Sequence, residues 1–165
     1  MGYEIRGVIS RGAVAQTVAE QFGPGTRAVE LEQGFALVPY TGKAQDHVPG
    51  ERGAKLSPFW RLDSLVAELL AQVSRAGPLA YVEADFFGGV GEQRAAVWEA
   101  GALVWGPTGI EPQQATPPEG TPISQALRRI GVTRADPVWD EFDALGLRRY
   151  RHTDDWLRDL IDEDE

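Results

Sequence analysis

Hydrophobic residues in the first half of the chain follow two spacings, one typical of strands and one typical of helices. Residues 3–10 are predicted to form a strand, and the apolar residues of 11–22 fall at helical spacing. Two further strand candidates follow at 27–32 and 35–40. The Gln33-Gly34 pair between them favours a hairpin, because glycine accepts the positive φ that tight turns need.

The clearest periodicity lies in the middle of the chain. Ser57-Pro58 is interpreted as the opening of this helical region and Gly77-Pro78 as its end. The polar residues 41–56 favour an exposed loop before it, and residues 79–87 favour a strand after it. Leucine and valine recur at the spacing of an amphipathic helix, at Leu62, Leu65, Val66, Leu69, Leu70 and Val73.

This order of elements predicts an α+β fold with an antiparallel sheet. The sequence β-α-β-β-α-β is that of a split β-α-β, or ferredoxin-like, sheet in which two helices cover one face. We expect a further hairpin and C-terminal helices to extend it within a single domain over 1–165. In that scheme 1–106 form the sheet and two helices, 107–120 form a Pro/Gly-rich linker, and 121–165 form a helical extension with an acidic tail.

Two helices are predicted in the C-terminal extension. The first begins at Thr121-Pro122, where threonine is a favourable cap and proline a favourable first helical residue. The second begins at Thr153, whose own hydroxyl is expected to cap it, with acidic residues in the first turn, where the helix dipole favours negative charge.

The stretch FFGGVG, which contains Gly88, Gly89 and Gly91, invites a phosphate-binding interpretation. Glycines let backbone amides approach an anion, but arginine stands at the third glycine of the dinucleotide fingerprint and no Gly-Lys-Ser/Thr follows. Carboxylates also flank the stretch and would repel a phosphate. We therefore interpret it as a turn between two strands, with residues 93–99 open to either strand or helix. A strand there would turn at Ala100-Gly101 and return over 102–106.

Two groups of charged residues are candidate binding residues. Glu83 and Asp85 lie two positions apart on a predicted strand and so share a face, while Glu92 follows the glycines. A carboxylate pair of this kind can act as acid and base, hold a cation, or form a solvated face. The second group is Arg148, Arg151 and His152, which could clamp an anion or be neutralised by the acidic residues beside them in the sequence.

Composition excludes several kinds of chemistry. The 165-residue chain has no cysteine, which removes thiolate nucleophiles and cysteine-based metal sites, and its two histidines leave any metal centre dependent on carboxylates. We expect no cofactor, no metal and no catalytic residue. The net charge of −9 opposes nucleic-acid binding, which depends on cations, and favours a basic protein partner. No apolar run suggests a membrane span, so a cytoplasmic protein is expected, with a homo-oligomer left open.

Three segments carry a resemblance to known proteins: YVEADFFGGVGEQRAAVW, PISQALRRIGV and DEFDALGLRRYRHTDDW. With these segments the chain resembles a family of small proteins from high-GC actinobacteria, over most of residues 1–156. That resemblance implies no activity, so it assigns a role to no residue. In kind, though not in motif, an acidic α+β protein of this size is also similar to bacterial toxin-immunity proteins.

The sequence therefore leads to three hypotheses of function. The first is a non-enzymatic protein-binding module, most concretely an acidic immunity-type protein that neutralises a basic toxin. The second is a small enzyme or ligand-binding domain in which the carboxylates around residue 83 converge with the arginines and histidine of 148–152. The third is a phage or conjugation accessory protein.

Overall fold

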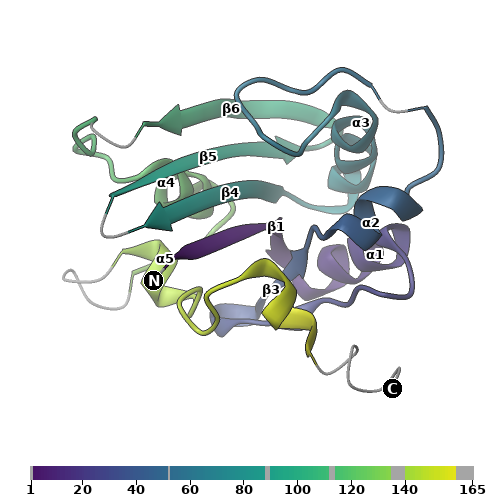
Figure 1. Cartoon of the computed structure of the whole chain (residues 1–165), viewed down its shortest axis with the longest axis horizontal. Coiled ribbons are helices and arrows are strands. Elements are labelled where there is room, and N and C mark those ends of the chain that lie inside the picture. Colours follow the sequence, from purple (N-terminus) through teal and green to yellow (C-terminus); the bar gives the residue numbers. More distant parts are fainter. Residues whose placement is uncertain (1, 52, 88–89, 112–113, 135–139, 159–165) are drawn as a thin grey trace.

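The computed structural model describes residues 2–51, 53–87, 90–111, 114–134 and 140–158 (Figure 1). Within these ranges the strands form one antiparallel sheet in the order β2-β3-β1-β4-β5-β6. Figure 1 shows β4, β5 and β6 side by side, with β6 at the rim. The strands are β1 (Tyr3–Arg11), β2 (Val29–Glu30), β3 (Phe35–Pro39), β4 (Leu79–Phe87), β5 (Val90–Glu99) and β6 (Ala102–Ile110).

Helices cover both faces of the sheet. On one face α1, α2 and α3 pack over Val8 and Tyr81, and they lie together at the right of Figure 1. On the other face α4, α5 and the 3-10 turn η3 pack over Ile5 and Val82. The helical elements are α1 (Gly12–Phe22), α2 (Gly42–His47), α3 (Ser64–Val73), α4 (Pro122–Arg129) and α5 (Glu141–Ala144), with 3-10 turns η1 (Glu32–Gly34), η2 (Ser74–Ala76) and η3 (Thr153–Leu157).

The predicted α+β fold with an antiparallel sheet is confirmed, but the ferredoxin-like order is not. The complete strand order differs, because β5 and β6 continue the sheet beyond β4. Helices also cover two faces instead of one. The physical reason is that β1, β4 and β5 carry apolar side chains on both sides, and each apolar face must be buried against another layer.

Most predicted elements are present, with three corrections to their limits. The helix expected from Ser57-Pro58 begins at Ser64, because the Asp63 carboxylate accepts the Val66 amide at 3.0 Å and so caps α3. The predicted loop 41–56 contains a helix, α2, capped by Thr41. The strand expected to end at residue 106 continues to Ile110, because it stays paired with β5.

The two predicted hairpins around β5 and the one before β3 are confirmed. β2 pairs with β3 as predicted, but the turn has three residues instead of two, because the Leu31 amide still donates to the Phe35 carbonyl and η1 (Glu32–Gly34) makes the connection, with φ angles of 63° at Gln33 and 79° at Gly34. β5 and β6 turn at Ala100 and Gly101, with φ angles of 53° and 87°. In the two-residue β5–β6 turn, positive φ at both central residues is what a hairpin needs to match the twist of its strands.

The C-terminal segment corrects one further prediction. Thr153 begins η3, but its hydroxyl does not cap that turn; it donates to Glu4 Oε2 at 2.7 Å and accepts the Arg6 amide at 3.0 Å. The Glu4 amide in turn donates to the Arg151 carbonyl at 2.7 Å. Residues 151–153 therefore line β1 where β3 has ended, which satisfies backbone groups that the sheet leaves open.

In the described part of the chain, no helix is both long and apolar enough to cross a bilayer.

Candidate functional site

The glycine stretch lies in the hairpin between β4 and β5. Phe87 pairs with Val90 and Phe86 with Gly91, so the turn interpretation is confirmed, while Gly88 and Gly89 lie outside the described residues. A strand, not a helix, follows the glycines, so no helix N-terminus faces a bound phosphate there. At Gly91 a β-carbon would overlap the Phe86 ring. The glycine is therefore explained by a close aromatic neighbour.

Two rows of charged side chains cross β1, β4 and β5 on the face that carries α1 and α3. One row is Arg6, Glu83 and Arg94, in which opposite charges alternate from strand to strand. The helices cover the apolar end of this face, and these rows occupy the other end. The next row toward the hairpin is Glu4, Asp85 and Glu92, in which three carboxylates lie opposite one another.

Glu83 is a fully buried carboxylate with a structural set of partners. Its oxygens accept the Trp60 and Arg61 amides at 2.6 and 2.9 Å and the Tyr81 hydroxyl at 2.7 Å. Burial and then the neighbouring Glu83 charge raise the pKa of Tyr81 well above 10.0, so this hydroxyl remains a donor. Glu83 thus holds the loop before α3 on the sheet and is not free to serve as an acid or base.

Arg94 completes this arrangement from β5. Its guanidinium donates to Glu92 and Glu111 at 3.0 Å each, and it lies 4.2 Å from the centroid of the Trp60 ring. The Arg94 side chain is 8% exposed, whereas Glu92 and Glu111 are 29% and 58% exposed, so the arginine is buried while its carboxylate partners remain in contact with water. Of the predicted carboxylates, only Asp85 is exposed and without a hydrogen bond or ion pair among the described residues.

The second predicted group lies beside β1 but does not join the first. Arg148 forms an ion pair with Asp143, whereas Arg151 and His152 are exposed. Among the described residues, no hydrogen bond or ion pair links these side chains to Glu83 or Asp85. The convergent pocket of carboxylates, arginines and histidine expected by the second hypothesis is therefore not formed by these groups.

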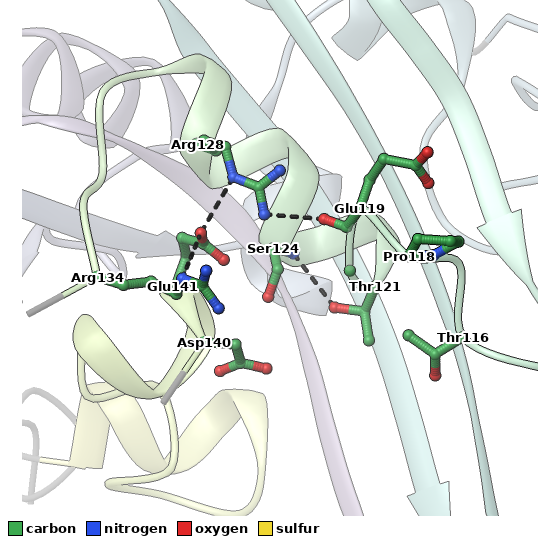
Figure 2. Close-up of a pocket in the computed structure, with 10 residues that line it drawn as sticks. Thr116, Pro118, Glu119, Thr121, Ser124, Arg128, Arg134, Asp140 and Glu141 are labelled. Atoms are coloured by element: carbon green, nitrogen blue, oxygen red, sulfur yellow. Dashed lines mark hydrogen bonds and ion pairs between the residues drawn. The ribbon is translucent and has the colours of Figure 1, made fainter. Parts of the chain in front are cut away.

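A pocket that the sequence did not indicate lies between α4, α5 and the segment before α4 (Figure 2). Its volume is about 360 Å³, within the range of small-molecule sites. The lining residues are Thr116, Pro118, Glu119, Gly120, Thr121, Ser124, Arg128, Arg134, Asp140 and Glu141. Three of them carry carboxylates and two carry guanidinium groups.

Glu141 is the centre of the charges in this pocket. Its Oε1 lies 3.1 Å from Arg128 Nε and 3.6 Å from Arg134 Nε, and its side chain is only 3% exposed. The other oxygen, Oε2, is buried and has no hydrogen-bond partner within the described structure. The Ser124 hydroxyl is also buried and unpartnered, and Figure 2 shows it pointing into the space beside Asp140 and Thr121. Buried polar atoms without partners are rare in native proteins and call for an explanation.

The N-terminus of α4 borders the same pocket, but its amides are already used. The Ser124 amide donates to the Thr121 hydroxyl at 3.3 Å and the Ile123 amide to Gln93 Oε1 at 3.0 Å, while Pro122 has no amide hydrogen. The helix end therefore offers no free donor set to an anion, and the pocket's recognition groups are its side chains.

A second, shallower hollow lies at the end of α1. It has a volume of about 320 Å³ and is lined by Gln16, Ala19, Glu20, Gly23, Pro24, Thr26, Arg27 and His47. The His47 ring packs against Gly23, where a β-carbon would overlap it. The hydroxyl of Thr26 is buried and makes no hydrogen bond to any residue that the structure describes. Among its lining residues Glu20 is the one carboxylate, whereas three carboxylates line the pocket beside α4.

The rim of the sheet is the other notable surface. Leu103 and Val104 on β6 are 42% and 48% exposed, and they are the exposed large hydrophobic residues of the described chain. Within the described ranges β6 pairs only with β5, so its outer edge is open. No group of three or more Asp, Glu or His side chains in these ranges could hold a metal ion.

Comparison of the chain with protein-family models, curated proteins and solved structures finds no match. The surfaces and pockets of this chain are therefore the features that bear on its function.

Proposed function

We propose that the chain is a non-enzymatic protein-binding module that receives an extended segment of a basic partner along β6. An immunity-type protein that neutralises a basic toxin is the most concrete form of this proposal. A phage or conjugation accessory protein would use the same surface for assembly. We place the protein in the cytoplasm, and we regard β2-β3-β1-β4 with α1 and α3 as a ferredoxin-like unit that the β5–β6 hairpin extends.

The observation that supports this proposal is the open, apolar edge of the sheet. An edge strand offers unpaired backbone donors and acceptors, which an extended segment can use by adding a strand. β6 carries Leu103 and Val104 exposed to water at its first half, beside the half-buried Trp105. The useful part of the edge is Ala102–Trp105, because Pro107 in the second half has no amide hydrogen to donate.

The charge of the chain favours a basic segment as the binding partner of β6. Exposed carboxylates lie at both ends of β6, with Glu99 just before the turn and Glu111 just after the strand. Arg75 and Arg129 also lie near this strand and offset the two carboxylates locally. The attraction for a basic partner therefore comes mainly from the net charge of −9 of the whole chain. A second copy of the chain would be repelled by that charge, whereas a basic segment would be attracted.

The enzyme hypothesis receives less support from the geometry. Glu83 is occupied by three hydrogen bonds, and the exposed His152 has no orienting partner among the described residues. A histidine that acts as a base normally has such a partner and a place for substrate beside it.

The test is a comparison of partner capture by the wild-type chain and by Val104→Lys. A lysine at this position removes apolar contact area and repels a basic segment, so we expect the partner to be lost. The matched control is Ala13→Lys, which adds the same charge at an exposed position of α1. The captured protein is then identified, purified and titrated against each variant at low and high salt.

The proposal predicts a basic partner whose affinity falls as the salt concentration rises. Val104→Lys should weaken the binding free energy by about 2 kcal/mol or more, as for a residue at the centre of an interface. Ala13→Lys should bind as the wild type does. A partner that binds both variants equally would refute the role of β6. Failure to obtain any protein partner at any salt concentration would refute the binding function itself.

A further inference from the structure

We propose that the pocket between α4 and α5 binds a small zwitterion, a free α-amino acid in its simplest form. This site goes beyond the protein-binding function proposed above and shares none of the β6 residues. It depends on two observations, the unpartnered buried atoms of the pocket and the balance of charges around them.

The buried atoms show that a polar partner is missing. Ser124 is 1% exposed and Glu141 2% exposed, yet the Ser124 hydroxyl and Glu141 Oε2 have no hydrogen bond within the described structure. A buried carboxylate oxygen without a donor destabilises the fold, because its hydrogen bonds to water are lost on burial and no protein hydrogen bond replaces them. A ligand with an N–H or O–H group in the pocket would supply that donor.

The charges select the class of ligand. Within the described ranges Arg134 forms one ion pair, with Glu141 at 3.6 Å, and makes no hydrogen bond. Its N–H groups are therefore available to a carboxylate, which a guanidinium binds through two parallel hydrogen bonds. Glu141 Oε2 has no partner in the described structure, whereas Asp140 Oδ1 accepts the Asp143 amide at 2.9 Å and caps α5. Glu141 Oε2 and the second Asp140 oxygen, Oδ2, are therefore the acceptors that the pocket offers to an ammonium group, and both side chains lie on the same side of Ser124 in Figure 2.

Ligands with one charge fit less well. An inorganic anion would face the carboxylates of Glu119, Asp140 and Glu141, and the amides at the start of α4 are already used. A bare cation would face the guanidinium groups of Arg128 and Arg134. A molecule with both an ammonium and a carboxylate group neutralises each side, and a volume of about 360 Å³ holds a molecule of that size.

The experiment is a titration of the 165-residue chain with the common α-amino acids, in which two-dimensional NMR monitors the backbone amide resonances. Three further probes separate the contributing groups. Propionate is alanine without its ammonium group, ethylamine is alanine without its carboxylate, and inorganic phosphate is a simple anion. We expect saturable shifts from at least one amino acid, confined to the segments around Ser124 and Glu141, and at least tenfold weaker binding of all three further probes.

Two variants test the residues. Ser124→Ala removes a hydroxyl that has no hydrogen-bond partner among the described residues, so the fold should be as stable as the wild type while binding weakens about tenfold. Glu141→Gln keeps the shape of the side chain and should weaken binding at least as much. The control is Ser64→Ala at the exposed first residue of α3, which should bind as the wild type does.

Three results would overturn the proposal. One is the absence of saturable shifts around the pocket with every amino acid. Another is binding of phosphate or propionate as tight as that of the best amino acid, which would show an anion site. The third is a folded Ser124→Ala protein that binds with unchanged affinity.

Discussion

Replacement of Glu83 by alanine should strongly destabilise the fold. The carboxylate is fully buried on β4 and joins the sheet to the loop before α3. The variant leaves three donors without their acceptor, namely the Trp60 and Arg61 amides and the Tyr81 hydroxyl. It also removes the negative charge that lies between Arg6 and Arg94 in the cross-strand row.

The expected loss follows from these contacts. A hydrogen bond to a charged group contributes about 1.5–3 kcal/mol, and loss of one partner from a buried charged pair costs about 3–5 kcal/mol. Arg61 is exposed, so water can replace one of the three bonds. We therefore expect the free energy of unfolding to fall by about 3–4 kcal/mol, which corresponds to a drop in Tm of roughly 10 °C for a chain of this size.

Urea and thermal unfolding measure this loss directly, and Asp85→Ala is the matched control. It removes the same group from the same face of the same strand, but Asp85 is exposed and has carboxylates opposite it on both sides. Because like charges facing each other across strands are unfavourable, that variant should be no less stable than the wild type. Faster trypsin cleavage after Arg61 in Glu83→Ala would show that the loop is released. Equal stability of the two variants would refute the role assigned to Glu83.

Three further predictions concern other parts of the fold. The pKa values of Tyr3 and Tyr81 are raised, mainly by burial, so the stability that depends on their protonated hydroxyls is fully present below pH 10.0 and is lost as pH rises through the folded-state pKa. Urea unfolding at a series of alkaline pH values should show the free energy of unfolding fall in this range, and Tyr3→Phe should make that fall less steep. Gly91→Ala should displace the Phe86 ring and cost about 1–3 kcal/mol in urea unfolding, and an unchanged midpoint would show that the ring moves freely. Thr153→Val, at a buried residue, should cost about 1–3 kcal/mol and expose the C-terminal segment to proteolysis, whereas wild-type resistance would show that its hydroxyl bonds are dispensable.

The charged rows could in part be predicted from the sequence. Once FFGGVG is interpreted as a hairpin turn, counting outward from it places Glu83 opposite Arg94 and Asp85 opposite Glu92, as observed. The same count says nothing about β1 or about the loop that supplies the Trp60 amide, because these pairings are not local. The carboxylate that looked like a candidate acid is therefore an anchor for a distant loop.

The pocket beside α4 could not be predicted in this way. Thr121 and Pro122 marked the start of the helix correctly, but Ser124 was only one polar residue inside it. Glu141 is one of the acidic residues that precede Arg148 in the sequence, yet its observed partners are Arg128 and Arg134. These side chains form a candidate site because they are buried together without partners for all their polar atoms, and that burial depends on how α4 and α5 pack on the sheet.

The sequence by itself determined the type of most elements, the hairpin turns and the antiparallel α+β class, because each depends on residues within a few positions of one another. Only the tertiary structure decided that helices cover both faces of the sheet, that 151–153 line β1, and that β6 is left with an open edge. These features join segments far apart in the chain. Such contacts depend on the fit of whole surfaces and on loop closure, and neither is encoded in the local spacing of residues.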